Sequence, residues 1–96
     1  MGLVVEAENV VDSGKLIKLK VDLEDGELRT IFTGVRTYGY TPEFFLNKKF
    51  IFVTNLEYKK IMGEESQGMI LCAERSDGKP VFLIAAEDVE VGARVR

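Results

Sequence analysis

The clearest pattern along the chain is a strict alternation of apolar and charged residues from Ile17 to Leu23. A period of two predicts a strand with one buried and one solvated face. A partner strand is expected at residues 28–33, because the acidic run 24–27 contains the Asp-Gly pair typical of a hairpin turn. Residues 3–8 predict a further strand before this hairpin. The first third of the chain is therefore expected to consist of strands.

One short helix is predicted in the middle of the chain. Thr41 is a favourable helix N-cap, Pro42 suits the first helical position, and the acidic Glu43 lies in the first turn. Phe44-Phe45-Leu46 follows, and Asn47 is expected to end the helix.

Apolar runs after the helix predict buried strands at residues 50–53, 69–73 and 81–85, and the tail, residues 89–96, could add an edge strand. Strands with a short helix between the third and the fourth match the OB-fold, a five-stranded Greek-key barrel. We therefore predict an all-β fold with small helical content, in a single domain spanning residues 1–96.

The stretch from Asn55 to Met69 carries more chemistry than a connector between strands requires. It contains a carboxamide, the adjacent Lys59 and Lys60, and a Ser-Gln-Gly-Met run. Loops that hold specific side chains on a rigid scaffold are common binding sites. This stretch is predicted to be the functional element.

Composition argues against most enzyme classes. The chain has no histidine, which removes the commonest metal ligand and the usual general base. Its single cysteine, Cys72, cannot form an internal disulfide and is expected to be a small buried hydrophobe. No Asp/Glu pair lies in an apolar setting that would raise a pKa. We expect no catalytic residues, no metal and no cofactor.

No apolar run approaches the ~20 residues that a membrane helix needs. The first residues lack the basic start of a secretory signal. A cytoplasmic protein without a membrane partner is the expectation.

The formal net charge of −3 argues at first against a nucleic-acid partner. The basic residues are concentrated, however, at Lys15, Lys18 and Lys20, at Lys48-Lys49 and at Lys59-Lys60. A folded sheet can separate these groups from the acidic runs, so the net charge does not settle the question. A solvated face and a phosphate-facing one stay equal alternatives for the strand lysines.

Several motifs together resemble one known family. The most specific is Gly-x-x-Ser-Gln-Gly-Met, from Gly63 to Met69, which follows Asn55-Leu56. Weaker matches lie at residues 12–16, 40–43 and 91–95. The chain resembles the tRNA-binding domain found at the C-terminus of many methionyl-tRNA synthetases and as free-standing structure-specific tRNA-binding proteins.

The resemblance implies a non-catalytic OB-fold that binds tRNA by shape and backbone. It implies an affinity handle for an aminoacyl-tRNA synthetase, with the methionyl-tRNA synthetase catalytic domain or subunit as a partner, or a free-standing protein. It also implies that Lys15, Asn55, Ser66 and Met69 lie near the RNA, although a Met at a strand start is more often core. Homodimers are common among bacterial members, which makes a homodimer a further expectation.

OB-folds bind irregular or single-stranded nucleic acid with a basic groove and stacking aromatic side chains. The predicted nucleic-acid-binding residues are Lys15, Lys18, Lys20, Arg29, Asn55, Lys59, Lys60, Ser66, Gln67 and Met69. The loop tyrosines Tyr38, Tyr40 and Tyr58 either stack bases or, for the first two, plug the barrel end.

Two rival functions stay open on the sequence. One is a protein-interaction or chaperone-like module on the same barrel, with an exposed apolar patch around Phe44-Phe45 and Met69. The other is an OB module for single-stranded DNA, which the 2′-hydroxyl of RNA would discriminate.

Overall fold

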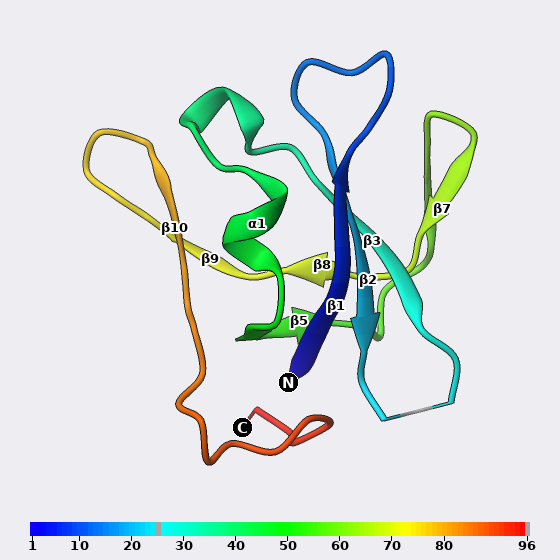
Figure 1. Ribbon diagram of the computed structural model, residues 1–96, viewed down its shortest axis with the longest axis vertical. Helices are drawn as coiled ribbons and strands as arrows, with labels where there is room; N and C mark the ends of the chain where they lie inside the picture. The colour runs from blue at the N-terminus through cyan, green and yellow to red at the C-terminus, as the bar shows by residue number, and fades with distance from the viewer. Residues whose placement is uncertain (25, 96) are drawn as a thin grey trace.

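The computed structural model describes residues 1–24 and 26–95 (Figure 1). It contains a curled antiparallel arrangement of short strands and one α-helix, consistent with an OB-like barrel. In chain order the elements are β1 (Gly2–Asn9), β2 (Ile17–Asp22), β3 (Arg29–Thr33), the 3-10 helix η1 (Arg36–Tyr38), α1 (Pro42–Phe45), β4 (Lys49–Phe50), β5 (Phe52–Val53), β6 (Lys59–Ile61), β7 (Glu64–Ser66), β8 (Met69–Ile70), β9 (Cys72–Glu74) and β10 (Pro80–Phe82).

The main sheet has the strand order β3-β2-β1-β4, and its neighbouring strands are antiparallel. The alternation that predicted β2 is confirmed, because Ile17, Leu19 and Val21 are all fully buried. β2 and β3 pair as the predicted hairpin. Asp25 of the expected turn lies outside the described residues.

The helix α1 lies between β3 and β4, as predicted. Thr41 occupies the N-cap position, but its side chain makes no capping hydrogen bond. The helix start therefore rests on Pro42 and on the packing of Phe45, which is fully buried. Asn47 lies beyond the helix with φ 61°, and its N–H donates to the carbonyl of Val4.

Aromatic rings fill the space between α1 and the strands. Phe45 contacts Phe82 at a centroid distance of 5.0 Å, and Tyr40 contacts Phe82 at 5.1 Å, both edge to face. Such pairs add stability beyond their buried area. The Tyr40 hydroxyl donates to the Pro80 carbonyl at 2.6 Å, so Tyr40 is a packing residue. Tyr38 is 47% exposed.

The apolar runs that predicted long strands are broken at single residues. In the first run Phe50 pairs with Gly2 in the main sheet, whereas Phe52 pairs with Ile70 of β8. The intervening Ile51 belongs to neither strand and accepts a hydrogen bond from the Leu71 N–H. Because the chain turns a corner there, one apolar run serves two sheets. The described residues thus hold ten short strands rather than the predicted five.

Other expectations for the second half of the chain were wrong. Cys72 is exposed, because β9 leaves the core and pairs only with β10 in a two-stranded sheet. The tail through Val95 forms turns rather than an edge strand. Its Gly92 N–H nevertheless donates to the Met1 carbonyl, which fixes the tail to the start of β1.

The stretch predicted as a loop contains a hairpin of β6 and β7. Its tip is formed by Met62 and Gly63, with φ of 51° and 85°. Positive φ at both central residues is the type I′ geometry, which favours Asn-Gly or Asp-Gly. Met-Gly lacks that signature, so nothing in the pattern pointed to the turn.

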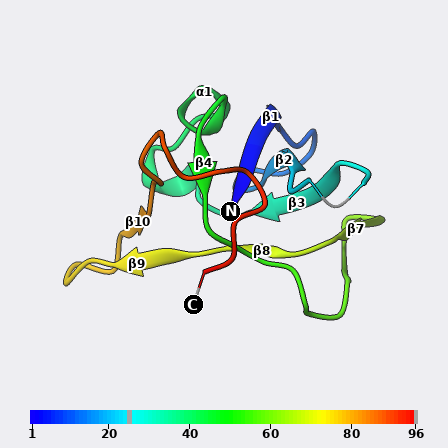
Figure 2. The same cartoon turned by 90° about the horizontal axis from the view of Figure 1, so that it is seen from below.

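The free edge of β3 is closed by the last residue of β7, Ser66, and by the residue after it, Gln67. The Thr30 N–H donates to Gln67 Oε1 and the Gln67 N–H to the Thr30 carbonyl, both at 2.8 Å. The buried Phe32 N–H donates to Ser66 Oγ at 3.2 Å. Figure 2 shows β8 and β9 crossing beneath β1–β3, with β7 beside β3. The Ser-Gln pair therefore fastens the main sheet to the second layer.

Gly68 allows the close approach that this closure needs. A Cβ at Gly68 would lie 2.9 Å from the Val53 carbonyl oxygen and 3.1 Å from Ile31 Cδ1. Gly68→Ala is expected to lower the free energy of unfolding by about 1–3 kcal/mol, measured by urea denaturation. Gly14→Ala is the control, because nothing lies within 4 Å of its Cβ position. Equal stability of the two variants would contradict the tight packing at Gly68.

Ser66→Ala tests the hydrogen bond to β3. The substitution leaves the buried Phe32 N–H without its acceptor, which should cost about 1–3 kcal/mol of unfolding free energy. Ser76→Ala removes the same hydroxyl from an exposed turn and should change stability by less than about 0.5 kcal/mol. Identical denaturation midpoints for both variants would argue against the role assigned to Ser66.

Candidate nucleic-acid interface

The β6–β7 hairpin places its lysines on opposite faces. Side chains alternate along a strand, so Lys59 and Ile61 share one face and Lys60 points to the other. Lys59 pairs in register with Ser66, which faces β3, and Lys60 pairs with Glu65. Both lysines are exposed. Lys60 and Glu65 therefore share the outer face of the hairpin, while Lys59 faces the inner side.

On that inner side the hairpin and the start of β8 enclose an open recess of about 230 Å³. Apolar side chains form most of it, among them Leu56, Ile61 and Met69. Met69 is 53% exposed and Leu56 48% exposed, so neither is a core residue. Lys59 and Glu57 also line the recess and supply its charged groups.

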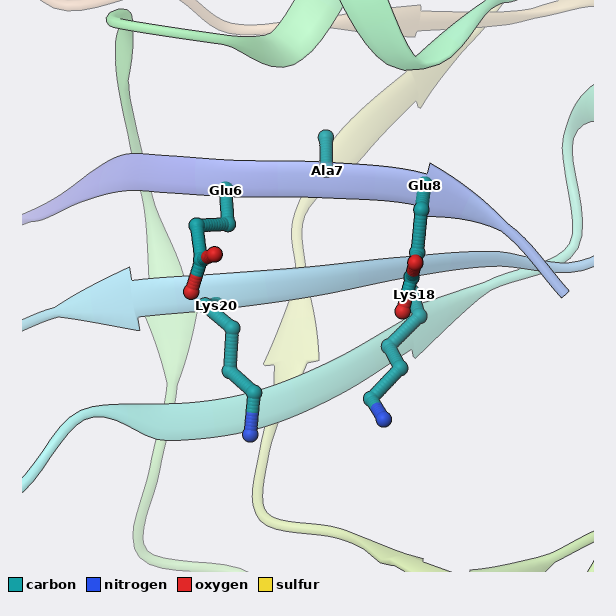
Figure 3. A pocket seen from close by; sticks show the side chains of 5 residues that line it. All are labelled: Glu6, Ala7, Glu8, Lys18 and Lys20. Carbon is teal, nitrogen blue, oxygen red and sulfur yellow. The ribbon is translucent and has the colours of Figure 1, made fainter.

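The lysines of β2 lie in an acidic surrounding. Glu6 and Glu8 of β1 pair in register with Lys20 and Lys18, and Figure 3 shows all four side chains lining one shallow pocket with Ala7. The Lys20 ammonium donates to Thr30 Oγ1 at 2.7 Å. The positive charge of this face is therefore largely balanced by its own carboxylates.

Lys18 also forms an ion pair with the hairpin. Its Nζ lies 2.9 Å from Glu64 Oε1, and the two side chains are 20% and 52% exposed. The hydrogen bond to Glu64 raises the pKa of Lys18, and the charges of Glu64, Glu8 and Glu6 act in the same direction while burial opposes them. Such an exposed pair contributes at most about 1 kcal/mol to stability. Glu64 therefore occupies the position that an external anion would take on Lys18.

Arg29 has a structural role in the same region. Its Nη1 donates to the carbonyls of Thr54 and Gln67, at 3.3 and 3.1 Å. It thus holds the two ends of the segment that carries the hairpin.

Lys15 and Asn55 lie apart from the recess lining. Lys15 is exposed just before β2, and its carbonyl accepts from the Arg36 N–H. Asn55 is exposed and lines a different groove, of about 800 Å³, together with Thr54 and Arg94.

The structure therefore divides the predicted residues into groups. Lys59, Ser66 and Met69 meet at the recess, although the Ser66 hydroxyl is engaged with the Phe32 N–H and the Gly68 carbonyl. Gln67 and Arg29 form hydrogen bonds with backbone groups, and Lys18 and Lys20 lie on the sheet face that carries Glu6 and Glu8. The residues outside the recess lining are Lys60, Lys15 and Asn55. Contact with nucleic acid stays a prediction for all of them.

Sequence reasoning missed three residues of this region. Leu56 and Ile61 needed the hairpin geometry to be recognised as recess walls. Glu64 is 46 positions from Lys18, and no local pattern indicates a pair at that separation.

Within residues 1–24 and 26–95 no cluster of His, Cys, Asp and Glu has the make-up of a metal site. Across that same part of the chain, none of the helices has the length and apolar character needed to span a membrane.

Comparison with known proteins places this geometry in a family. Residues 1–94 match the family described as putative tRNA binding domain. The chain is 45% identical over 96 residues to the methionine–tRNA ligase of Methanocaldococcus jannaschii, covering 100% of this chain and 14% of the ligase. It therefore spans about one seventh of that relative's length.

Comparison with solved structures shows the same fold in related proteins. A MetRS related protein from Pyrococcus horikoshii superposes with a TM-score of 0.91 at 50% identity, covering 99% of this chain and 85% of that one. The chaperone CsaA from Bacillus anthracis superposes with a TM-score of 0.82 at 22% identity, covering 99% and 86%, and this likeness concerns the fold alone. The family match over nearly the whole chain, together with the fold it shares with these structures, establishes that this chain belongs to the putative tRNA binding domain family.

Proposed function

We propose that this chain is a non-catalytic module that binds tRNA by shape and backbone. Membership of the tRNA binding domain family is the observation that carries the proposal. The face around the β6–β7 hairpin supports it, because Lys59 combines there with exposed apolar side chains. No step of catalysis is assigned to any residue.

The electrostatics favour weak, salt-sensitive binding. The net charge is −3, and the β2 lysines are already balanced by glutamates, so attraction depends on a few local cations. Each neutralised phosphate contributes about 0.7–0.9 to the salt slope of the binding constant. With about three to five such contacts, affinity in the micromolar range is expected at physiological salt.

We infer that residues 1–96 act as one appended unit. Tethering a weak RNA-binding unit to a catalytic partner raises the effective concentration of the RNA. The identity to a methionine–tRNA ligase supports the methionyl enzyme as that partner, in the same chain or as a subunit, and the cytoplasm as the location. A homodimer is part of the proposal as well, and a free-standing protein would use the same surface.

A second candidate function is a protein-interaction module. Val81, Leu83 and Ile84 are 38%, 44% and 52% exposed, and they follow one another in or just after β10. The apolar patch expected around Phe44-Phe45 is absent there, since Phe45 is fully buried and Phe44 packs against the core. The exposed residues near β10 are the observation that favours this alternative.

The first test is a gel-shift titration with unfractionated tRNA at two salt concentrations, beside a length-matched single-stranded DNA. Salt-sensitive binding that prefers tRNA supports the proposal. Equal affinity for the DNA would indicate a general single-strand binder, and no binding by folded protein at low salt would favour the protein-interaction module.

Lys15→Ala combined with Lys59→Ala is expected to weaken tRNA binding and flatten its salt dependence, because two exposed cations are lost. The matched control is Lys48→Ala with Lys79→Ala, whose ammonium groups lie over the rings of Phe44 and Tyr40. It removes the same charge beside the aromatic cluster. An unchanged affinity in the first variant, with its denaturation midpoint preserved, would contradict the placement of the site.

Glu64→Gln should strengthen tRNA binding about two- to threefold and steepen its salt dependence, since it releases Lys18 from its ion pair. Glu65→Gln is the control on the opposite face of β7. It changes net charge equally without touching Lys18. The same gain in both variants would mean that net charge, and not the ion pair, limits binding.

A further inference from the structure

We propose that the recess between the β6–β7 hairpin and the start of β8 holds one unstacked base of the bound RNA. The inference rests on the proposed function and names the ligand that this part of the surface takes. Met69 and Leu56 form its walls, and Lys59 lies at its rim as a contact for the adjoining phosphate.

The walls are two half-exposed apolar side chains that lie on one concave surface. Met69 and Leu56 leave about half of their surfaces in solvent, although both border the buried Phe32 in the same hollow. Exposed apolar surface gathered in a concave site marks a binding site. A thioether and a branched alkyl group are adaptable contacts for the flat face of a ring.

The shape is built before any ligand arrives. Ser66 Oγ accepts from Phe32 and donates to the Gly68 carbonyl at 3.2 Å, which fixes the back of the recess. Met69 is held beside it by the pairing with Val53. A site on strands with internal hydrogen bonds loses little entropy on binding.

Size and charge select a base. The volume of about 230 Å³ is smaller than the roughly 300 Å³ at which drug-sized sites begin, so one ring system fits better than an extended peptide. Lys59 provides a cation next to the apolar walls, which suits a phosphate joined to that ring. Glu57 also lines the recess, and its carboxylate can accept a hydrogen bond from an exocyclic amino group. Proteins that recognise folded RNA commonly take such unpaired bases into pockets.

The first experiment removes the walls singly in the full chain. Leu56→Ala and Met69→Ala should each weaken binding of unfractionated tRNA about three- to tenfold while leaving the salt slope unchanged, because no phosphate contact is lost. Ile84→Ala is the matched control: Ile84 is 52% exposed and follows β10, which Figure 1 shows well apart from β7. Its affinity should equal that of the unaltered chain.

The second experiment uses the absence of tryptophan from the sequence. Met69→Trp gives the chain a single indole at the recess, and the fluorescence of that indole should be quenched when tRNA is added. Inorganic polyphosphate, which has phosphates but no bases, should compete for the lysines and leave the fluorescence unchanged. An Ile84→Trp chain should respond to neither ligand.

The outcomes distinguish a failure of the base site from a failure of the proposed function. If the unaltered chain fails to bind tRNA, the proposed function fails together with the base site. If it binds tRNA with the expected salt dependence while Leu56→Ala and Met69→Ala bind equally well, only the base site is overturned. Quenching of Met69→Trp by polyphosphate, or by an apolar peptide but not by tRNA, would also overturn it.

Discussion

The hydrogen bonds between the free edge of β3 and Ser66-Gln67 are the constraint on which the rest of the structure depends. An open edge strand carries unpaired N–H and C=O groups, and a buried N–H without a partner is costly. Here Gln67 exchanges bonds with Thr30 through both its backbone and its side chain, and Ser66 takes the Phe32 N–H. These contacts close the curled sheet, and they also set where the β6–β7 hairpin leaves it. Lys59 pairs in register with Ser66, so its position relative to β3 depends on the same bonds.

The residues from Ser66 to Met69 therefore have different structural roles. Ser66 and Gln67 saturate β3, and Gly68 permits the approach of Val53 and Ile31 that a side chain would block. Only Met69 turns its side chain outward. A motif that is specific for a binding family can thus be mostly structural, with its one exposed side chain, the proposed ligand contact, held in place by the other residues.

The local sequence pattern was sufficient to predict structure where a side chain packs only against neighbouring elements. The period of two in β2 predicted its buried face, and its limits to within one residue, since the strand ends at Asp22 rather than Leu23. Pro42 marked the start of α1. Prediction failed where a residue's role is set by distant chain. Ile51 breaks an apolar run because the strands on either side join different sheets, and Cys72 is exposed because β9 pairs away from the core. The basic and polar residues of the candidate site could be named from the sequence. Their grouping could not, because it depends on the β6–β7 hairpin, whose Met62-Gly63 turn lacks a typical turn sequence.

Charge balance explains how an acidic domain can be a reversible RNA binder. Lys18 forms an ion pair with Glu64 and lies near Glu8 and Glu6. A phosphate that binds Lys18 must displace the Glu64 carboxylate, so the net binding free energy is only the difference between two similar interactions. Lys59 forms no ion pair with any residue that the structure describes, and it lies beside an apolar recess. The attraction between a lysine and a phosphate weakens as the salt concentration rises, whereas the contact between a ring and apolar side chains does not. The proposed site combines one exposed cation with an apolar recess, and is therefore expected to keep part of its affinity at physiological salt without binding polyanions in general. The proposed role as an affinity handle that releases its RNA requires this combination.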